Sequence, residues 1–468
     1  MKRRSSFVLA LLLALGILSS CGDTALSDDT VPADPFLDIT YGEEGDKTVR
    51  EQRQEIKDAM ERAINTEVVY KEIEEYNPTL EKYDHIKAIT YDAFEYQGKK
   101  TKVFAYVGFP EGASAEDPVP AVVLVHGNGG HPYMEWIRLW NARGYAAIAM
   151  EISGYFPSEP NVGVTENQNG MFVYGMHGVF LEEGYTDSPD RSFTTEYAEV
   201  EDQWLYHGLT HIILAHNILR QDERVDNDNI GVTGIPLGGM LTSQLIGYDT
   251  RFSFAIPVYG TAYLGDETRP YREFAHPYVD ALWAAERNLD NAKMPILWLT
   301  YADDVHFGVP SYVKSYMHTK NVTDKTALLM ITDWGHSHNS VFKTNYSFLF
   351  ADWVTFDRGG VITFETEPEG REINCKINIP EDNKEWVSAV LYYITEPMSY
   401  SEYDKFGKGV NMYLDQEWKK NQTCLKVDVE TGTVTGTIPE DAKGYYIQLF
   451  FFSQGESSFS SSSFVNVE

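Results

Sequence analysis

The sequence predicts an α/β fold, in which a mostly parallel sheet is covered by helices, followed by a small all-β sandwich. Between residues 85 and 356, short apolar runs alternate with amphipathic stretches, which is typical of βαβ units. After Gly359-Gly360 the helical periodicity stops, and short β-branched or aromatic segments separated by turns follow. The length of 468 residues is about three times that of a usual domain, which agrees with one large and one smaller domain.

The charge balance excludes one class of partner. The chain carries 70 acidic and 38 basic side chains, which give a formal net charge of -32. Nucleic-acid binding needs clustered Lys and Arg side chains that displace counterions from phosphates, and this acidic composition argues against it. With only three cysteines, the fold does not need disulfides as its main support.

The N-terminus has the pattern of an export signal. A basic head at residues 2–4 precedes an apolar run over residues 7–18, which is too short to span a bilayer comfortably. The run ends at Leu18-Ser19-Ser20-Cys21, which resembles the lipobox of bacterial lipoproteins, where the cysteine is acylated after cleavage. We therefore expect a lipoprotein signal peptide over residues 1–20 and an acidic tether over residues 21–46. An ordinary signal peptide with a chance cysteine is the alternative.

This resemblance implies an exported protein that is anchored by lipid on Cys21 to a bacterial membrane, in the periplasm or at the cell surface. The N-terminal lipid would be its only contact with the bilayer. The acidic body of the protein would be repelled from an anionic membrane surface.

The elements of the large domain follow in order. A surface helix is expected over residues 48–64, and a Gln97-Gly98 turn joins two β-like segments at 85–94 and 102–109. Buried strands of the parallel sheet are expected at 119–125, 145–151, 229–233, 252–259, 294–301 and 326–332. Helices are expected between and after them at 131–144, 203–221, 239–247, 310–317 and 345–355.

Two segments interrupt this alternation, at about residues 155–201 and 261–291. The first lacks periodicity, and the second follows a strand where a short loop would suffice. Long loops at the carboxyl ends of strands commonly carry binding sites. We therefore treat both as insertions in an α/β domain that spans residues 47–358.

Residues 359–468 are expected to form an immunoglobulin-like accessory domain that folds separately, so that truncation after Arg358 would leave a soluble α/β domain. The predicted strands are 361–365, 372–379, 386–395, 425–429, 433–438, 445–452 and 464–467. The serine run from Ser457 to Ser463 is expected to be a polar hairpin loop. Cys375 and Cys424 are either a disulfide or two buried thiols, and the sequence leaves both open.

Unusual residues follow four of the predicted strands. In an open α/β sheet, ligands bind beyond the carboxyl ends of the strands, so these positions are the candidates for a site. The segments are His126-Gly127-Asn128-Gly129-Gly130, Gly234-Ile235-Pro236-Leu237-Gly238-Gly239, Asp303-Asp304 and Trp334-Gly335-His336-Ser337-His338.

In this order the segments resemble the α/β-hydrolases of the acetyl-xylan-esterase and dienelactone-hydrolase-like family. In that family a His-Gly-rich loop, a Gly-x-Ser-x-Gly-Gly elbow, an Asp and a His follow one another. The similarity covers roughly residues 85–356, and it implies an α/β-hydrolase fold and an esterase activity. By this resemblance Asp304 is the acid and His336 the general base, with His338 as the alternative base. The backbone N–H groups implied as the oxyanion hole are those of Gly127, Asn128 and Leu237.

Further side chains near these segments are candidates for substrate contacts. They are His126, Tyr259, His306 and Trp334. The alternative is that the histidines and aromatic rings only pack in the core. A metal site built from the histidines and aspartates is disfavoured, because no His-Glu-x-x-His spacing or Cys partner supports it. We expect neither a metal nor a cofactor.

Position 236 departs from the family pattern, because proline stands where the family carries its nucleophilic serine. Proline has no hydroxyl to attack a carbonyl, so no acyl-enzyme can form there. The strained elbow is also expected to need a positive φ, whereas proline is restricted to about -65°. The neighbouring glycines are retained, so we expect the fold to survive with a relaxed turn.

Two functions therefore compete. The first is an exported carboxylester hydrolase, acting on acylated glycans as the resemblance implies. The second is an inactive pseudo-hydrolase that binds a glycan or another small molecule. Pro236 favours the second, whereas Asp304, His336 and the loop at His126 favour descent from an enzyme.

Overall fold

The computed structural model describes residues 40, 47–128, 130–154, 156, 165–166, 172–173, 199–264, 277–304, 306–332, 334–342, 344–397 and 417–467. The predicted signal peptide and Cys21 lie outside these residues, as do most of the tether and most of the first insertion. No helix in the described ranges combines the length and the apolar character needed to cross a membrane.

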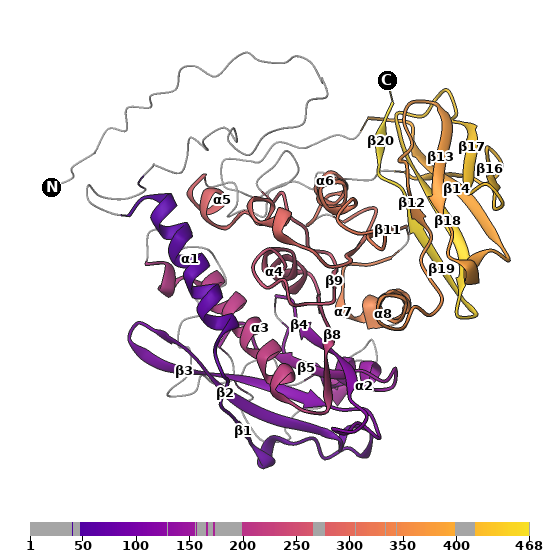
Figure 1. Cartoon of the computed structure of the whole chain (residues 1–468). Coiled ribbons are helices and arrows are strands. Elements are labelled where there is room, and N and C mark those ends of the chain that lie inside the picture. Colours follow the sequence, from indigo (N-terminus) through magenta and orange to yellow (C-terminus); the bar gives the residue numbers. More distant parts are fainter. Residues whose placement is uncertain are drawn as a thin grey trace.

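A mixed sheet with a parallel centre forms the large domain (Figure 1). Its strands lie in the order β1 (Tyr70–Glu72), β2 (Ile86–Tyr96), β3 (Lys99–Gly108), β5 (Ala146–Met150), β4 (Val119–Val125), β8 (Val225–Gly234), β9 (Phe254–Pro257), β10 (Leu297–Tyr301) and β11 (Ala327–Ile331). The first three strands are antiparallel, and β5, β4, β8 and β9 pair in parallel. Two parallel bridges continue the sheet from β9 to β10, which pairs in parallel with β11.

Helices cover both faces of this sheet (Figure 1). One face carries α3 (Trp204–Gln221), α4 (Leu237–Leu245) and α6 (Val309–Thr319), with α1 (Val49–Ile64) packed outside α3. The other carries α2 (Met134–Asn141) and α8 (Tyr346–Phe356), which meet where Trp140 packs edge-on against Phe348. Shorter elements are α5 (Pro277–Trp283), α7 (His338–Phe342), β6 (Thr165–Glu166), β7 (Phe172–Val173) and the 3-10 turns η1 (Glu74–Tyr76), η2 (Glu81–Tyr83), η3 (Val200–Asp202), η5 (Ala285–Arg287), η6 (Leu289–Asn291) and η7 (Glu381–Asn383).

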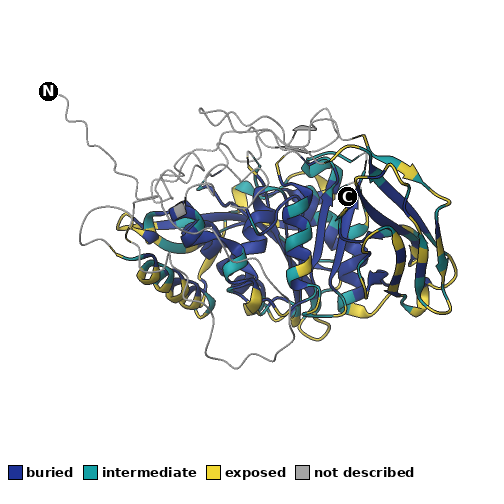
Figure 2. Ribbon diagram, turned by 90° about the horizontal axis from the view of Figure 1, so that it is seen from above, coloured by how far each residue is buried: buried dark blue, intermediate teal, exposed yellow. Residues whose placement is uncertain are grey.

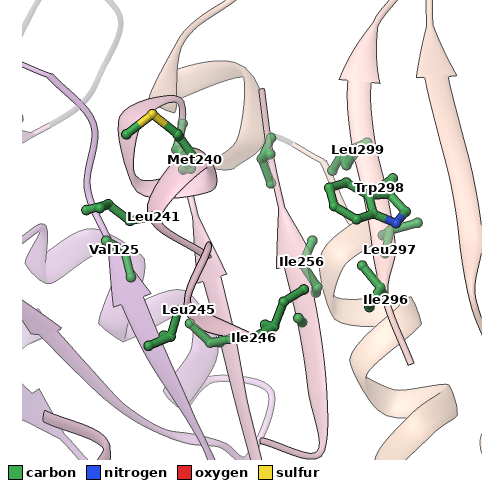
Figure 3. Packing of buried hydrophobic residues seen from close by; sticks show 14 of the residues in the cluster. Val125, Met240, Leu241, Leu245, Ile246, Ile256, Ile296, Leu297, Trp298 and Leu299 are labelled. Atoms are coloured by element: carbon green, nitrogen blue, oxygen red, sulfur yellow. The ribbon is translucent and has the colours of Figure 1, made fainter. Parts of the chain in front are cut away.

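The continuous apolar runs of the sequence become strands that are buried on both faces (Figure 2). The core between α4 and the central strands is built from aliphatic side chains of β4, β9 and β10, with the Trp298 ring among them (Figure 3). The predicted fold class is confirmed, because helices cover a mostly parallel sheet and an all-β region follows.

The all-β region has two facing sheets. One has the order β12 (Thr363–Phe364), β13 (Glu372–Asn378), β17 (Thr433–Thr437) and β16 (Leu425–Asp428). The other contains β19 (Glu456–Ser461), β18 (Gly444–Ser453), β14 (Val387–Ile394) and β15 (Lys419–Asn421), with β20 (Val465–Asn466) paired to β18. This second sheet is continuous with the central sheet, because β19 also pairs with β11 (Figure 1).

The predicted polar loop at Ser457 to Ser463 is wrong, because most of this run belongs to β19 and pairs with β18. The turn lies earlier, at Gln454-Gly455, where both residues have positive φ. Ser458 and residues 460–463 are buried at the junction, whereas Ser457 is exposed, and several of the buried hydroxyls bond to main-chain groups there. The Ser461 hydroxyl accepts from Met330 N–H at 3.0 Å, and the Ser462 hydroxyl accepts from Ile447 N–H at 2.9 Å. Composition suggested a loop, but these contacts form only in the assembled sheet.

Both cysteines of the all-β region are free thiols. Cys375 on β13 pairs with Val434 of β17, and Cys424 directly precedes β16 on the other side of β17. An intervening strand thus separates the two sulfurs, which excludes the disulfide alternative in this fold. Burial raises the pKa of Cys375 to about 12, so this thiol is not a reactive one.

The continuous sheet changes the expected result of truncation after Arg358. Removing β19 uncovers the edge of β11 and the buried residues packed against it, and an uncovered hydrophobic edge promotes association. We expect the truncated protein to aggregate or to unfold at a clearly lower temperature than the full chain. Differential scanning calorimetry and size-exclusion chromatography measure both. A monomeric truncation with an unchanged melting temperature would contradict this expectation.

Candidate functional site

The turn between β8 and α4 is the structural counterpart of the predicted elbow. β8 ends at Gly234, and α4 begins at Leu237, with Pro236 as the residue that precedes the helix. Pro236 has φ -18° and ψ -73°, so the turn lacks the positive φ expected of an elbow nucleophile. Its carbonyl accepts the Met240 N–H at 3.0 Å and starts the helix. Pro236 thus occupies the N-cap position of α4, with a φ that departs from the value of about -65° usual for proline.

Glycines bring this turn against the neighbouring strands. A Cβ atom on Gly238 would lie 2.1 Å from the Val125 carbonyl oxygen at the end of β4. A Cβ atom on Gly239 would lie 2.4 Å from the Val258 carbonyl oxygen beyond β9. Both separations are far shorter than any real contact, so these positions require glycine.

The predicted acid and base lie together. The Asp304 carboxylate follows β10, and its Oδ2 lies 2.9 Å from Nδ1 of His336, which follows β11. Its Oδ1 accepts the N–H groups of His306 and Phe307 at 2.7 and 3.0 Å. The carboxylate is fully buried, whereas the imidazole is 18% exposed. This arrangement orients His336, as in an acid–base pair of a hydrolase.

Aromatic residues fix the ring of His336. Tyr259 and Phe307 lie nearly parallel to it, at centroid distances of 4.8 and 6.2 Å. The Tyr259 hydroxyl donates to the Gly335 carbonyl at 2.6 Å, which holds the loop that carries the base. Tyr259 is itself fully buried, so it supports His336 instead of contacting a ligand as predicted.

His126 is also too deeply buried for its predicted role in substrate contact, with 1% of its surface exposed. Its Nε2 lies 3.2 Å from the carboxylate of Glu151, and its Nδ1 lies 2.9 Å from the Gly127 carbonyl oxygen. Glu151 accepts the N–H groups of Ile152 and Ser153 at 3.1 and 2.8 Å. The pair thus ties the loop after β4 to the end of β5.

The Gly127 amide, predicted to belong to the oxyanion hole, is already hydrogen-bonded. Its N–H donates to Nε2 of His338 at 3.0 Å. His338 opens α7 and packs against the Tyr133 ring at 4.9 Å. Burial, helped by nearby histidines, lowers the pKa of His338 to about 3, so the ring stays neutral and can accept this bond.

The alternative base, His338, is thus bonded to the loop predicted to form the oxyanion hole, whereas His336 is bonded to Asp304. A Cβ atom on Gly127 would lie 2.7 Å from Cδ of Pro236 and 3.1 Å from Cε1 of His338, so all three residues converge. His306 is exposed, with its ring 4.7 Å from that of His336. The other predicted residues differ in exposure: Asn128 is exposed, Trp334 is half-buried against Tyr259, and Leu237 is buried.

Two residues of this region were missed by sequence reasoning. Glu151 is a carboxylate directly after an apolar strand, a position that could have marked it. Tyr133, which packs against His338, carries no such signal because its partner lies about two hundred residues away in the chain. In the part of the chain that the structure describes, no three His, Cys, Asp or Glu side chains are grouped to hold a metal ion.

An elbow at a helix start, a buried Asp and a His after successive strands of a parallel sheet define the class of α/β-hydrolases. The family profile described as acetyl xylan esterase (AXE1) matches residues 52–308, and the chain belongs to this family. The family predicted from the strand-end segments is therefore confirmed. The matched range includes Pro236 and Asp304, and His336 lies beyond it. No curated protein sequence matches the chain.

Solved structures with a similar fold include esterases. An acetyl xylan esterase from Paenibacillus sp. R4 is 17% identical, with 63% of this chain and 92% of that chain covered and a TM-score of 0.42. Acetyl xylan esterase 1 from Thermoanaerobacterium sp. JW/SL YS485 is 14% identical, with coverages of 64% and 100% and a TM-score of 0.44. A carbohydrate esterase family 15 glucuronoyl esterase from Caldicellulosiruptor kristjansonii is 15% identical, with coverages of 66% and 86% and a TM-score of 0.39.

Neutral histidines make the stability of this region depend on pH. Burial lowers the pKa of His338 to about 3 and that of His131 to about 4, from the ordinary 6.5. The unfolded chain binds protons that these folded rings do not bind, so the free energy of unfolding falls as pH drops from about 6.5 toward 4. Urea unfolding at pH 7 and pH 5 measures this loss. In His338→Gln, which keeps an acceptor for Gly127, the loss should be smaller; an equal loss would contradict the neutral His338.

Proposed function

We propose that this member of the acetyl xylan esterase family binds an acylated glycan, or a related small ester, and does not hydrolyse it by serine chemistry. The observation that carries the proposal is Pro236 at the top of the turn between β8 and α4. A proline side chain offers no oxygen for an acyl-enzyme. The names of similar structures, which include acetyl xylan and glucuronoyl esterases, suggest the class of ligand.

The Gly127 amide supports the same conclusion. In a hydrolase, free N–H groups must point at the oxygen that becomes negative in the transition state. Here the Gly127 N–H donates to His338, so it is not available to an oxyanion in this arrangement. Two parts of the serine mechanism are therefore altered at one place, the nucleophile position and a predicted oxyanion donor.

The acid–base pair supports retained binding. Asp304 and His336 remain 2.9 Å apart, and the imidazole is partly exposed beside the exposed His306 ring. Polar groups that converge on one accessible place can orient a ligand through hydrogen bonds. With the Nδ1–H of His336 directed at Asp304, its Nε2 would accept a hydrogen bond from a ligand hydroxyl without any bond in the ligand being broken.

A second candidate function is slow hydrolysis by water. The pair of Asp304 and His336 favours it, because an oriented imidazole can take a proton from water. Hydrolases without their nucleophile keep a residual rate on the order of 10³-fold over water. Turnover of 4-nitrophenyl acetate that is lost in His336→Ala would support this candidate against pure binding.

Restoring the nucleophile tests the main proposal. The unmodified protein should not react with a fluorophosphonate probe, whereas Pro236→Ser should be labelled and should hydrolyse 4-nitrophenyl acetate, because it regains a hydroxyl at the elbow. Gel fluorescence and absorbance measure both. Calorimetry with acetylated xylo-oligosaccharides should detect binding to the unmodified chain. Strong labelling of the unmodified protein, or no binding, would overturn the proposal.

A matched pair of further variants identifies the base within the Pro236→Ser protein. His336→Ala should abolish labelling, because His336 is the residue that Asp304 orients. His338→Ala should increase the labelling rate by about 10-fold or more, because it frees the Gly127 N–H for the oxyanion. If the two effects were reversed, His338 would be the base and the assignment of His336 would be wrong.

We also propose that the chain is exported and anchored through a lipid on Cys21. The basic head, the apolar run and the small residues before Cys21 support this localisation. In a bacterial host, metabolic labelling with an alkyne fatty acid should mark the protein and place it in the membrane fraction. Cys21→Ala should lose both signals, while Cys424→Ala serves as a control that keeps them. Labelling that persists in Cys21→Ala would contradict the anchor.

A further inference from the structure

The all-β region holds the two strands that carry the acid and the base. β11, which precedes the loop of His336, pairs with β19 at Leu328 and Ser461. The Met330 N–H donates to the Ser461 hydroxyl, and the Met330 carbonyl accepts from the Gln448 side chain at 2.9 Å. The end of β10 is joined to β11 in turn, because Ala302 N–H donates to the Ile331 carbonyl at 2.8 Å. The loops that carry Asp304 and His336 thus both follow strands that are joined to the all-β region.

The helix after the acid is attached to the same region. Glu367 lies just beyond β12, and its carboxylate accepts from the Tyr316 hydroxyl of α6 at 2.9 Å. It also forms an ion pair with Lys320 and accepts the Ser463 N–H at 2.7 Å. Lys320 and Glu367 are both 9% exposed at the side chain, so this link is shielded from solvent. Glu367 therefore links α6 to the all-β region through an ion pair and hydrogen bonds.

One side chain of the all-β region reaches the turn of the acid directly. Trp418 directly precedes β15, and its indole N–H donates to Oδ1 of Asp303 at 2.7 Å. Asp303 is the residue before Asp304. The turn is thus held at three successive residues: at Ala302 by β11, at Asp303 by Trp418, and at Asp304 by its N–H bond to the Tyr301 carbonyl.

The Trp418 ring is fixed by its own surroundings. It packs edge-on against Tyr446 and Phe464, at centroid distances of 5.1 and 6.0 Å. Tyr446 stacks in turn on Tyr392, at 5.1 Å and an interplanar angle of 5°. An indole clamped in this way presents its N–H at a set position, which a mobile surface side chain would not do.

We propose that Trp418 is a positioning residue of the site, which holds Asp303 and thereby keeps Asp304 bonded to His336. Two adjacent carboxylates repel each other, and the indole N–H stabilises the outer one by a charge-assisted bond. Without this bond the turn after β10 loses its direct link to the all-β region, and the bond from Asp304 to His336 lengthens. The all-β region is then part of the site, whether the site binds a ligand or turns it over.

Proton NMR of the full chain tests this proposal without any activity. An imidazole Nδ1 proton bonded to a buried carboxylate is deshielded and protected from exchange, and His336→Asn identifies the resonance of His336. Trp418→Phe keeps the ring packing and removes the N–H, so it should shift this resonance or broaden it. Asp303→Ala should do the same, and Asp303→Asn, which keeps an oxygen acceptor, should preserve it.

The protein supplies its own controls. His216 and Asp249 form a second buried pair of this kind, with Nδ1 and Oδ2 2.9 Å apart, and its resonance should not change in Trp418→Phe. Trp386→Phe changes a tryptophan of the same region that is 49% exposed, and both resonances should remain. An unchanged His336 resonance in Trp418→Phe would overturn the proposal, and so would equal changes in both resonances, which indicate general loosening.

A second measurement uses the Pro236→Ser protein. There Trp418→Phe should slow fluorophosphonate labelling by about 10-fold, since a displacement of about 1 Å costs about 10²-fold and a smaller one costs less. An unchanged rate would contradict the positioning role. If Pro236→Ser were not labelled at all, the proposal about serine chemistry would fail, and the NMR result on the unmodified chain would still decide the role of Trp418.

Discussion

The close approach of backbone at the elbow is the constraint on which the site depends. A Cβ atom on Gly260 would lie 2.1 Å from the Met240 nitrogen, and one on Gly234 would lie 2.1 Å from the Gly238 carbonyl oxygen. Only glycine permits these separations, so the start of α4 lies against the ends of β4, β8 and β9. The scaffold of an α/β-hydrolase elbow is therefore complete, although proline stands at its centre at position 236.

The all-β region is best understood as an extension of the central sheet. β19 covers β11, and buried serine hydroxyls take the place of apolar side chains where the two parts meet. The hydroxyls of Ser460, Ser461 and Ser462 have main-chain partners, which compensate the cost of burying them. The consequence for function is that the loops of Asp304 and His336 are held from a part of the chain that follows them in sequence.

Much of the fold could be predicted because buried parallel strands leave a local signal. Apolar runs such as residues 119–125 and 326–332 became β4 and β11, and the residues just after them formed the site. The pairing of Asp304 with His336 was reached through family resemblance and not through periodicity. The prediction of a polar loop at the serine run was wrong, because local composition does not show that these residues pair with β11 and β18.

The sequence by itself determined the chemical inventory: a proline at position 236, an Asp, a His, and glycines where backbones must touch. These are local properties, since a side chain's functional groups and its allowed φ travel with the residue. Only the tertiary structure decided which groups remain accessible. It buried His126 and Tyr259, turned His338 onto the Gly127 amide, and brought the indole of Trp418 to Asp303. Such contacts depend on how distant segments pack, and burial is a property of the assembled fold.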